Sequence, residues 1–122
     1  MNHEVAMKWI AALRSGKYPK GQHYLNYKGQ FCCLGVLCDL AAQEMPVHQG
    51  SIGPLIWYDG QQKTLPPTVE NWAGLRSTLG RLPNLGRTFK ETNASSLTEV
   101  NDLTDTDFNG IADIIESCWE EL

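Results

Sequence analysis

The sequence predicts an α+β fold in a single small domain, residues 1–122, with a central buried helix. The N- and C-terminal helices are expected to pack with it on a small antiparallel sheet. Three observations support this prediction. A central apolar stretch has helical spacing, an amphipathic segment lies near each end, and short β-prone runs are separated by turn signals. A chain of 122 residues, 42% of them hydrophobic, can bury a real core.

The central helix is predicted from the longest apolar run, residues 31–42, and should cover residues 33–43. Its apolar side chains fall on two faces, which indicates burial around most of the helix. These residues are Leu34, Leu37, Cys38 and Ala41 on one face, and Val36 and Leu40 on the other. Gly35 is expected to allow close approach of the N-terminal or the C-terminal helix.

The two terminal helices carry apolar residues three and four positions apart. The first is predicted over residues 2–14, with Asn2 as N-cap and Gly16 as the stop. The last is predicted to begin near Thr106 and to run to the C-terminus, with Thr104 or Asp105 as its N-cap. Its apolar stripe is formed by Phe108, Ile111, Ala112, Ile115, Cys118, Trp119 and Leu122.

The remaining elements are short. A tight hairpin is predicted from β-prone runs at 24–27 and 30–32, on either side of Lys28-Gly29. Residues 55–58 predict a strand that turns at Asp59-Gly60 and returns through residues 61–65. Two short helices follow, one opened by Pro66-Pro67 and closed by Gly74, the other opened by the capping box Ser96-Leu-Thr-Glu99.

Composition excludes several broad classes of function. The net charge of −4 argues against a general nucleic-acid coat protein. No run approaches the roughly eighteen apolar residues that span a bilayer, so no membrane partner is expected. The polar start Asn2-His-Glu4 is unlike a signal peptide, and the expected location is the cytoplasm. The four cysteines are therefore expected to be reduced and mostly buried.

Two polar loops are the candidate binding regions, because loops held by a rigid scaffold often carry function. The first covers residues 15–23. The second covers residues 75–94, which contain four basic residues and one acidic residue. A loop as long as the second one is uncommon in a compact domain. The candidate binding residues are Lys17, Tyr18, Lys20, His23, Arg76, Arg81, Arg87 and Lys90.

A cysteine nucleophile is the candidate for catalysis. Cys32 or Cys33 would lie at a helix N-terminus, where the dipole lowers the pKa of a thiol, and His23 or His48 could serve as the base, with Cys33 and His23 the preferred pair. The competing interpretation is that the thiol packs in the core. No local signature of a thiol enzyme accompanies these residues, so a binding protein is favoured over an enzyme. No cofactor is expected, since the sequence has no Gly-rich phosphate loop.

One stretch satisfies the spacing of an EF-hand calcium loop. Its ligand positions are occupied by Asp105, Asp107, Asn109, Asp113 and Glu116, and Gly110 stands at the sixth position. The apolar stripe of the last helix starts at Phe108, however, and a regular helix cannot also wrap an ion. The helix interpretation is preferred, so no metal is expected.

Three segments together resemble a group of small proteins common in tailed phages and prophages. They are Trp9–Tyr18, the block Phe31-Cys-Cys-Leu-Gly-Val-Leu-Cys-Asp-Leu40, and Leu97-Thr-Glu-Val-Asn-Asp102 followed by the helix from Phe108 to Glu116. The resemblance covers about half of the chain and implies a phage source, with no reaction attached. It implies an accessory protein that acts in the host cytoplasm, by blocking a host defence protein or by sequestering a small signal molecule.

We therefore expect a phage-encoded binding protein whose partner is a host protein, such as a CRISPR component or another defence protein. The alternatives are a binder or enzyme for a small nucleotide-like molecule, and a calcium-binding protein acting through residues 105–116. The small-molecule hypothesis places Tyr18, His23, Tyr24 and Cys33 around a pocket. Nucleic acid is a less favoured partner, through the basic loop 75–94.

Overall fold

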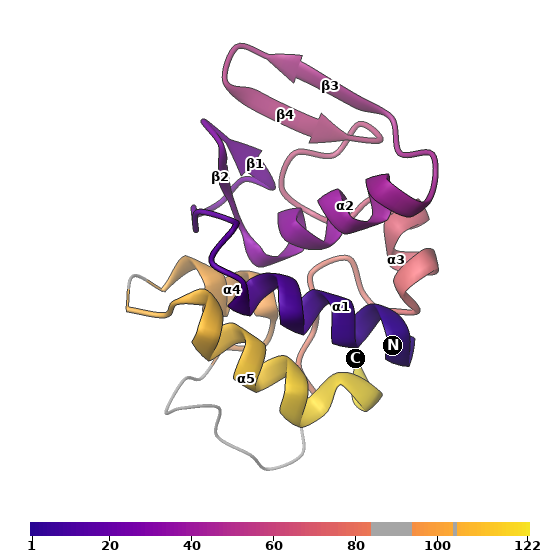
Figure 1. The fold of residues 1–122 in the computed structure, drawn as a ribbon, viewed down its shortest axis with the longest axis vertical. Coiled ribbons are helices and arrows are strands. Elements are labelled where there is room, and N and C mark those ends of the chain that lie inside the picture. Colours follow the sequence, from indigo (N-terminus) through magenta and orange to yellow (C-terminus); the bar gives the residue numbers. More distant parts are fainter. Residues whose placement is uncertain (84–93, 104) are drawn as a thin grey trace.

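The protein folds into helices and one small sheet, as a computed structural model describes for residues 1–83, 94–103 and 105–122 (Figure 1). The predicted α+β class is confirmed. In chain order the elements are α1 (His3–Arg14), β1 (Asn26–Tyr27), β2 (Gln30–Phe31), α2 (Cys33–Glu44), β3 (Gln49–Ile52), β4 (Leu55–Tyr58), α3 (Pro67–Ala73), α4 (Leu97–Asp102), α5 (Phe108–Cys118) and the 3₁₀ helix Trp119–Glu121. Within the described residues, no helix is long and apolar enough to span a lipid bilayer.

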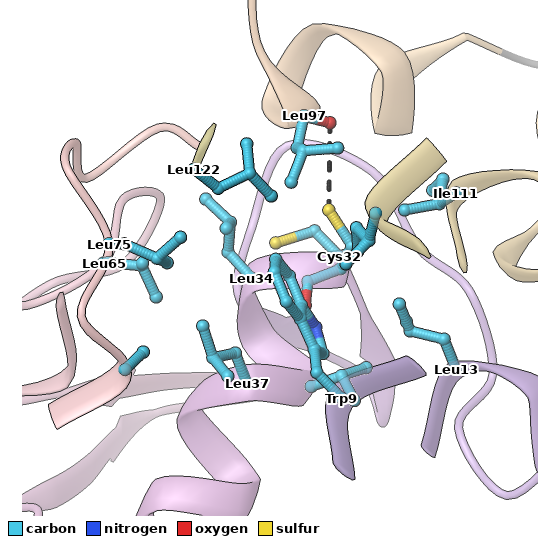
Figure 2. Close-up of a cluster of buried hydrophobic side chains, with 14 of the residues drawn as sticks. Trp9, Leu13, Cys32, Leu34, Leu37, Leu65, Leu75, Leu97, Ile111 and Leu122 are labelled. Carbon is cyan, nitrogen blue, oxygen red and sulfur yellow. Dashed lines mark hydrogen bonds between the residues drawn. The ribbon is translucent and has the colours of Figure 1, made fainter. Parts of the chain in front are cut away.

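The central helix is confirmed. Every residue of α2 from Cys33 to Cys38 is buried, as is Ala41. Figure 1 shows α2 between the sheet on one side and the pair α1 and α5 on the other. The indole of Trp9, in α1, donates a hydrogen bond to the Cys33 carbonyl at 2.9 Å and lies among the leucines of the core (Figure 2). The apolar run therefore forms the centre of the core.

The helices α1 and α5 pack side by side. Asn2 caps α1 as predicted, because its side chain accepts a hydrogen bond from the backbone N–H of Val5 at 3.1 Å. The apolar stripes of both helices are buried, except that Trp119 is only half-buried. On the exposed side, the Arg14 guanidinium joins the helices by ion pairs of 2.7 Å with Asp113 and with Glu116.

Gly35 does allow a close approach, but the predicted neighbour was wrong. A Cβ at this position would overlap the carbonyl group of Leu25, whose carbonyl carbon would lie only 2.6 Å away. The segment that leads into β1 therefore runs directly over α2, and neither terminal helix occupies this contact. Leu25 is fully buried there.

The sheet has strand order β2-β1-β4-β3 and is antiparallel. The predicted hairpin at Lys28-Gly29 is confirmed, with positive φ at both turn residues. The predicted return strand over residues 61–65 was wrong, because β4 pairs with β1 on one side and with the preceding segment, β3, on the other. Asp59 and Gly60 do turn the chain, but only Gln61 pairs back, with Tyr58.

Both short helices begin as predicted, and α3 also ends as predicted. Pro67 opens α3, and Gly74 ends it in the left-handed conformation, with φ of 71°. Ser96 caps α4 by accepting a hydrogen bond from the backbone N–H of Glu99. The Glu99 carboxylate reaches back to the hydroxyl of Ser95 at 2.7 Å. The helix α4 packs against α2 and α5, and its C-terminal end lies beside the loop of residues 20–23.

Candidate functional site

An open groove of about 650 Å³ lies where the loop after α1, the first hairpin and the segment before α5 meet. It joins Lys20 and His23 of the predicted binding set with Asp105 and Asp107 of the predicted calcium pattern. Its lining residues are Lys20, Gly21, Gln22, His23, Tyr24, Tyr27, Gln30, Asp105, Thr106 and Asp107. Two segments distant in sequence therefore form the two walls. Residues of the range 20–30 form the first wall, and residues 105–107 form the second.

The C-terminal end of α4 anchors the first wall. Asn101 is fully buried, and its side-chain oxygen accepts a hydrogen bond from the backbone N–H of Cys33 at 3.0 Å. Its side-chain nitrogen donates to the Gly21 carbonyl at 3.0 Å, and its own carbonyl accepts from the Lys20 ammonium at 2.7 Å. Asn101 thus joins α2, α4 and the loop of residues 20–23, which we call the groove loop.

Asp102 fixes the next residues of the same loop. Its carboxylate accepts a hydrogen bond from the backbone N–H of His23 at 3.0 Å, and its second oxygen lies 3.3 Å from Nδ1 of the His23 ring. His23 has a φ of 71°, a backbone conformation that is uncommon for residues with a side chain. The bonds to Asp102 hold it there, while the His23 side chain remains 64% exposed.

Tyr24 and Tyr27 form an aromatic pair at the mouth of the groove. Their ring centroids lie 5.4 Å apart, with 30° between the ring planes. The Lys63 ammonium lies 5.2 Å from the centroid of Tyr24, and the Lys28 ammonium lies 5.5 Å from that of Tyr27. Tyr27, Lys28 and Lys63 were not predicted as binding residues, although aromatic and basic residues beside the predicted hairpin were an available signal.

Tyr18 was predicted to contact a ligand, but its ring belongs to the scaffold. The Tyr18 hydroxyl donates a hydrogen bond to the Asp39 carboxylate, and the ring packs edge-to-face on Phe31 with centroids 5.0 Å apart. Burial and this hydrogen bond raise the pKa of Tyr18 to about 12. Lys17 is exposed in the same loop without lining the groove.

The basic residues of the second loop lie elsewhere. Arg81 lines a separate hollow of about 330 Å³ beside Ser96, at the N-terminal end of α4, whereas the groove lies at its C-terminal end. The backbone N–H of Arg76 bonds to the carbonyl of Leu122. The two predicted loops therefore do not form one surface in the described residues. Arg87 and Lys90 lie outside the described residues.

The structure does not support Cys33 as a nucleophile. The residue is fully buried, and its sulfur lies 3.8 Å from the Leu97 carbonyl oxygen, the contact marked by the dashed line in Figure 2. Burial raises the pKa of Cys33 well above its ordinary value. The predicted lowering by the helix dipole was wrong, because desolvation of the thiolate is the larger effect. His23 lies at the surface, and Cys33 does not line the groove.

The calcium pattern falls mainly on a helix. Residues 108–118 form α5, and its N-cap is Asp107, which accepts a hydrogen bond from the backbone N–H of Gly110 at 2.8 Å. The predicted N-caps, Thr104 and Asp105, were therefore too early. Asn109 is on the helix, and Asp113 and Glu116 pair with Arg14. Across the described ranges, no group of three His, Cys, Asp or Glu residues is placed to hold a metal ion.

Residues 1–119 match the family described as "Domain of unknown function (DUF8296)". No curated protein and no solved structure matches the chain. The matched range contains both walls of the groove and the α4 anchor. Because the match spans nearly its whole length, the chain belongs to the DUF8296 family.

Proposed function

We propose that the protein acts by binding another protein through the groove at Lys20 and His23. In the phage setting that the resemblance implies, the partner is a host defence protein, which this contact blocks in the host cytoplasm. The groove is open, and polar and aromatic side chains line it, an arrangement that suits a protein contact better than an enclosed reaction site. The buried thiols leave the groove without a cysteine nucleophile.

The observation that carries this proposal is the conformation of His23. A non-glycine residue at positive φ is strained by about 1–3 kcal/mol, and such strain is concentrated at functional sites. Here the bonds from Asp102 hold the strained residue while its ring faces solvent. The His23 ring takes no part in the core and stays exposed, which leaves it available to a partner.

Preorganisation of the loop strengthens the proposal. Ordering a free loop at an interface costs about 0.5–1.5 kcal/mol for each immobilised side chain. Lys20, Gly21, Gln22 and His23 are already held by bonds to Asn101 and Asp102, so little ordering remains to be done on binding. The tyrosine pair beside them adds the residue type that is enriched in interface hot spots.

The test compares two groove variants with the wild type. His23→Gly removes the ring and suits the positive φ, so the melting temperature should stay within a few degrees. Lys20→Glu reverses the charge on the same wall. Tagged proteins are used to capture partners from host cells, and the dissociation constant is then measured with the purified partner. Both variants should bind at least about tenfold more weakly, in line with a hot-spot loss of about 2 kcal/mol.

A control variant separates the groove from general charge. Lys8→Glu makes the same charge change on α1, where Lys8 forms an exposed ion pair with Glu44. It should bind the partner like the wild type and protect the phage equally in a plaque assay on a defended host. If His23→Gly and Lys20→Glu also behave like the wild type in both assays, the groove is not the contact surface and the proposal is wrong.

A second candidate function is sequestration of a small nucleotide-like molecule. The groove volume lies within the range of about 300–1,000 Å³ that is usual for ligand pockets. Tyr24 could stack on a base and Lys20 could pair with a phosphate, although Tyr18 and Cys33 of the predicted pocket do not line the groove. A panel of nucleotides should then raise the melting temperature of the wild type but not of Lys20→Glu.

A further inference from the structure

The four-stranded sheet has one face turned away from the helices. Figure 1 shows α2 running along one side of the sheet. Tyr58 and Asn26 are buried and joined by a hydrogen bond on that side. Tyr27, Leu55 and Ile52 stand opposite one another in the strand register and therefore share the other face. Tyr27 is 37% exposed and Ile52 is 66% exposed, so this outer face is open.

Aromatic rings lie along this outer face. Trp57 is two residues from Leu55 on β4, and its ring lies over Gly50, where a Cβ would overlap the indole. The glycine thus lets the indole lie down on the neighbouring strand. Tyr27 and Trp57 are diagonal neighbours on adjacent strands, which places them about 7–8 Å apart. Tyr24 extends the row, since its ring packs beside that of Tyr27.

The charge of the same region is opposite to that of the protein as a whole. The two segments that build the hairpins, residues 15–31 and 46–66, contain four lysines and one aspartate, a net charge of +3. The rest of the chain contains six basic and thirteen acidic residues, a net charge of −7. The single aspartate, Asp59, accepts hydrogen bonds from the His48 backbone and the Thr68 hydroxyl. Of these four lysines, Lys28 and Lys63 lie at the rings of the outer face, whereas Lys20 is bonded to the Asn101 carbonyl in the groove.

Rings and lysines occur together there. The Lys28 and Lys63 ammonium groups lie over the rings of Tyr27 and Tyr24. A ligand that lies on these rings would therefore meet a positive charge beside each tyrosine. Single-stranded nucleic acid offers both matching groups, because its bases stack on aromatic rings and its phosphates pair with lysines. An acidic protein segment would satisfy the lysines but would leave the row of rings without a stacking partner.

We propose that the outer face of the sheet binds single-stranded nucleic acid, with bases stacked on Tyr24, Tyr27 and Trp57 and phosphates held by Lys28 and Lys63. This binding activity goes beyond the proposed protein contact, which is centred on Lys20 and His23, although the outer face and the groove share Tyr24 and Tyr27. Recognition is expected to be independent of base sequence, because every base has a face that can stack.

The test is fluorescence anisotropy with two labelled probes, a twelve-nucleotide thymidine DNA and a twelve-nucleotide uridine RNA, at low salt. Tyr27→Ala should weaken binding about tenfold, as expected for loss of one stacked base. The double variant Lys28→Glu, Lys63→Glu should abolish binding. The logarithm of the wild-type affinity should fall with the logarithm of salt concentration by about 0.7 for each phosphate contacted. Binding should also quench tryptophan fluorescence, through Trp57.

Two controls make the result decisive. Lys8→Glu, on α1, is compared with the single reversals Lys28→Glu and Lys63→Glu, which change the net charge by the same amount, and it should bind both probes like the wild type. Polyglutamate serves as the competitor for an acidic protein. The proposal is overturned if the probes do not bind or if Tyr27→Ala binds like the wild type. It is also overturned if Lys8→Glu weakens binding as much as Lys28→Glu or Lys63→Glu does. Displacement of the probe by polyglutamate as readily as by unlabelled DNA would assign the face to an acidic protein instead.

Discussion

The side-chain oxygen of Asn101 accepts a hydrogen bond from the backbone N–H of Cys33 at 3.0 Å, and this bond joins the end of α4 to the start of α2. The first N–H groups of a helix have no partner within the helix, so a buried helix start needs an acceptor from elsewhere. Asn101 provides it and uses its side-chain nitrogen for the Gly21 carbonyl. The central helix and the groove loop thus depend on the same residue.

The first prediction concerns this residue. Asn101→Leu should leave the buried N–H of Cys33 without an acceptor, which costs about 1–3 kcal/mol. The loss should be visible as a lower urea midpoint, and the amide of Cys33 should exchange faster with deuterium. Asn109→Leu is the matched control, because Asn109 is exposed on α5. The role given to Asn101 would be incorrect if both variants shifted the midpoint equally.

The second prediction concerns Gly35. Alanine is normally preferred to glycine inside a helix by about 1 kcal/mol, so Gly35→Ala should stabilise α2 if the site had room. The Cβ would instead overlap the Leu25 carbonyl group, which is backbone and cannot easily move. We expect a net destabilisation of about 3 kcal/mol or more, measured by urea unfolding.

The comparison variant for Gly35 is Gly16→Ala. Gly16 has a φ of 76°, but a Cβ added there would meet no atom within 4 Å, so only the backbone strain of about 1–2 kcal/mol applies. The destabilisation at Gly35 should exceed that at Gly16. The reverse order would show that the Leu25 segment moves aside without cost.

The helices could be predicted from the sequence because their signals are local. The N-cap of α1, Asn2, directly precedes an apolar stripe that includes Trp9. Likewise, Gly74 directly follows the last residue of α3 and ends that helix. Strand β3 could not be predicted in this way. Its residues Gln49-Gly-Ser-Ile52 have little β-propensity, and Gly50 joins the sheet because the Trp57 ring of the next strand covers it.

The candidate site was only partly predictable for the same reason. Lys20 and His23 were expected from loop composition, but the other wall of the groove comes from residues 105–107, far along the chain. The Lys63–Tyr24 pair likewise joins two segments that only the folded sheet brings together. Asn101 looked like an ordinary polar residue near a helix end, since burial of its amide depends on three other segments.

The third prediction follows from the buried thiols. Burial raises the pKa of Cys32 to about 11 and the pKa values of Cys33 and Cys38 well above the ordinary value. In the unfolded chain these thiols ionise near pH 8.5. The folded protein retains protons that the unfolded chain loses, so this stabilisation is complete below about pH 8.5 and declines as pH rises toward 11.

The measurement is urea unfolding between about pH 7.5 and pH 9.5. This range lies below the pKa of about 10 at which tyrosines of the unfolded chain ionise. Each buried thiol should contribute a decline of up to about 1.4 kcal/mol per pH unit above its unfolded pKa. Cys38→Ala should make this slope shallower, whatever it does to the absolute stability. A stability that stays flat over the range would contradict burial of the neutral thiols.

The fourth prediction concerns residues 105–116. If Asp107 acts as the N-cap of α5, Asp107→Ala should lower stability by about 1 kcal/mol with or without calcium, and Asp107→Asn should restore most of the loss. Millimolar calcium should leave the melting temperature of the wild type unchanged, because Asp113 and Glu116 lie on the helix and pair with Arg14. A calcium-dependent rise that Asp107→Ala abolishes would mean that the helix start opens to wrap an ion, since ligand binding stabilises the state that binds it.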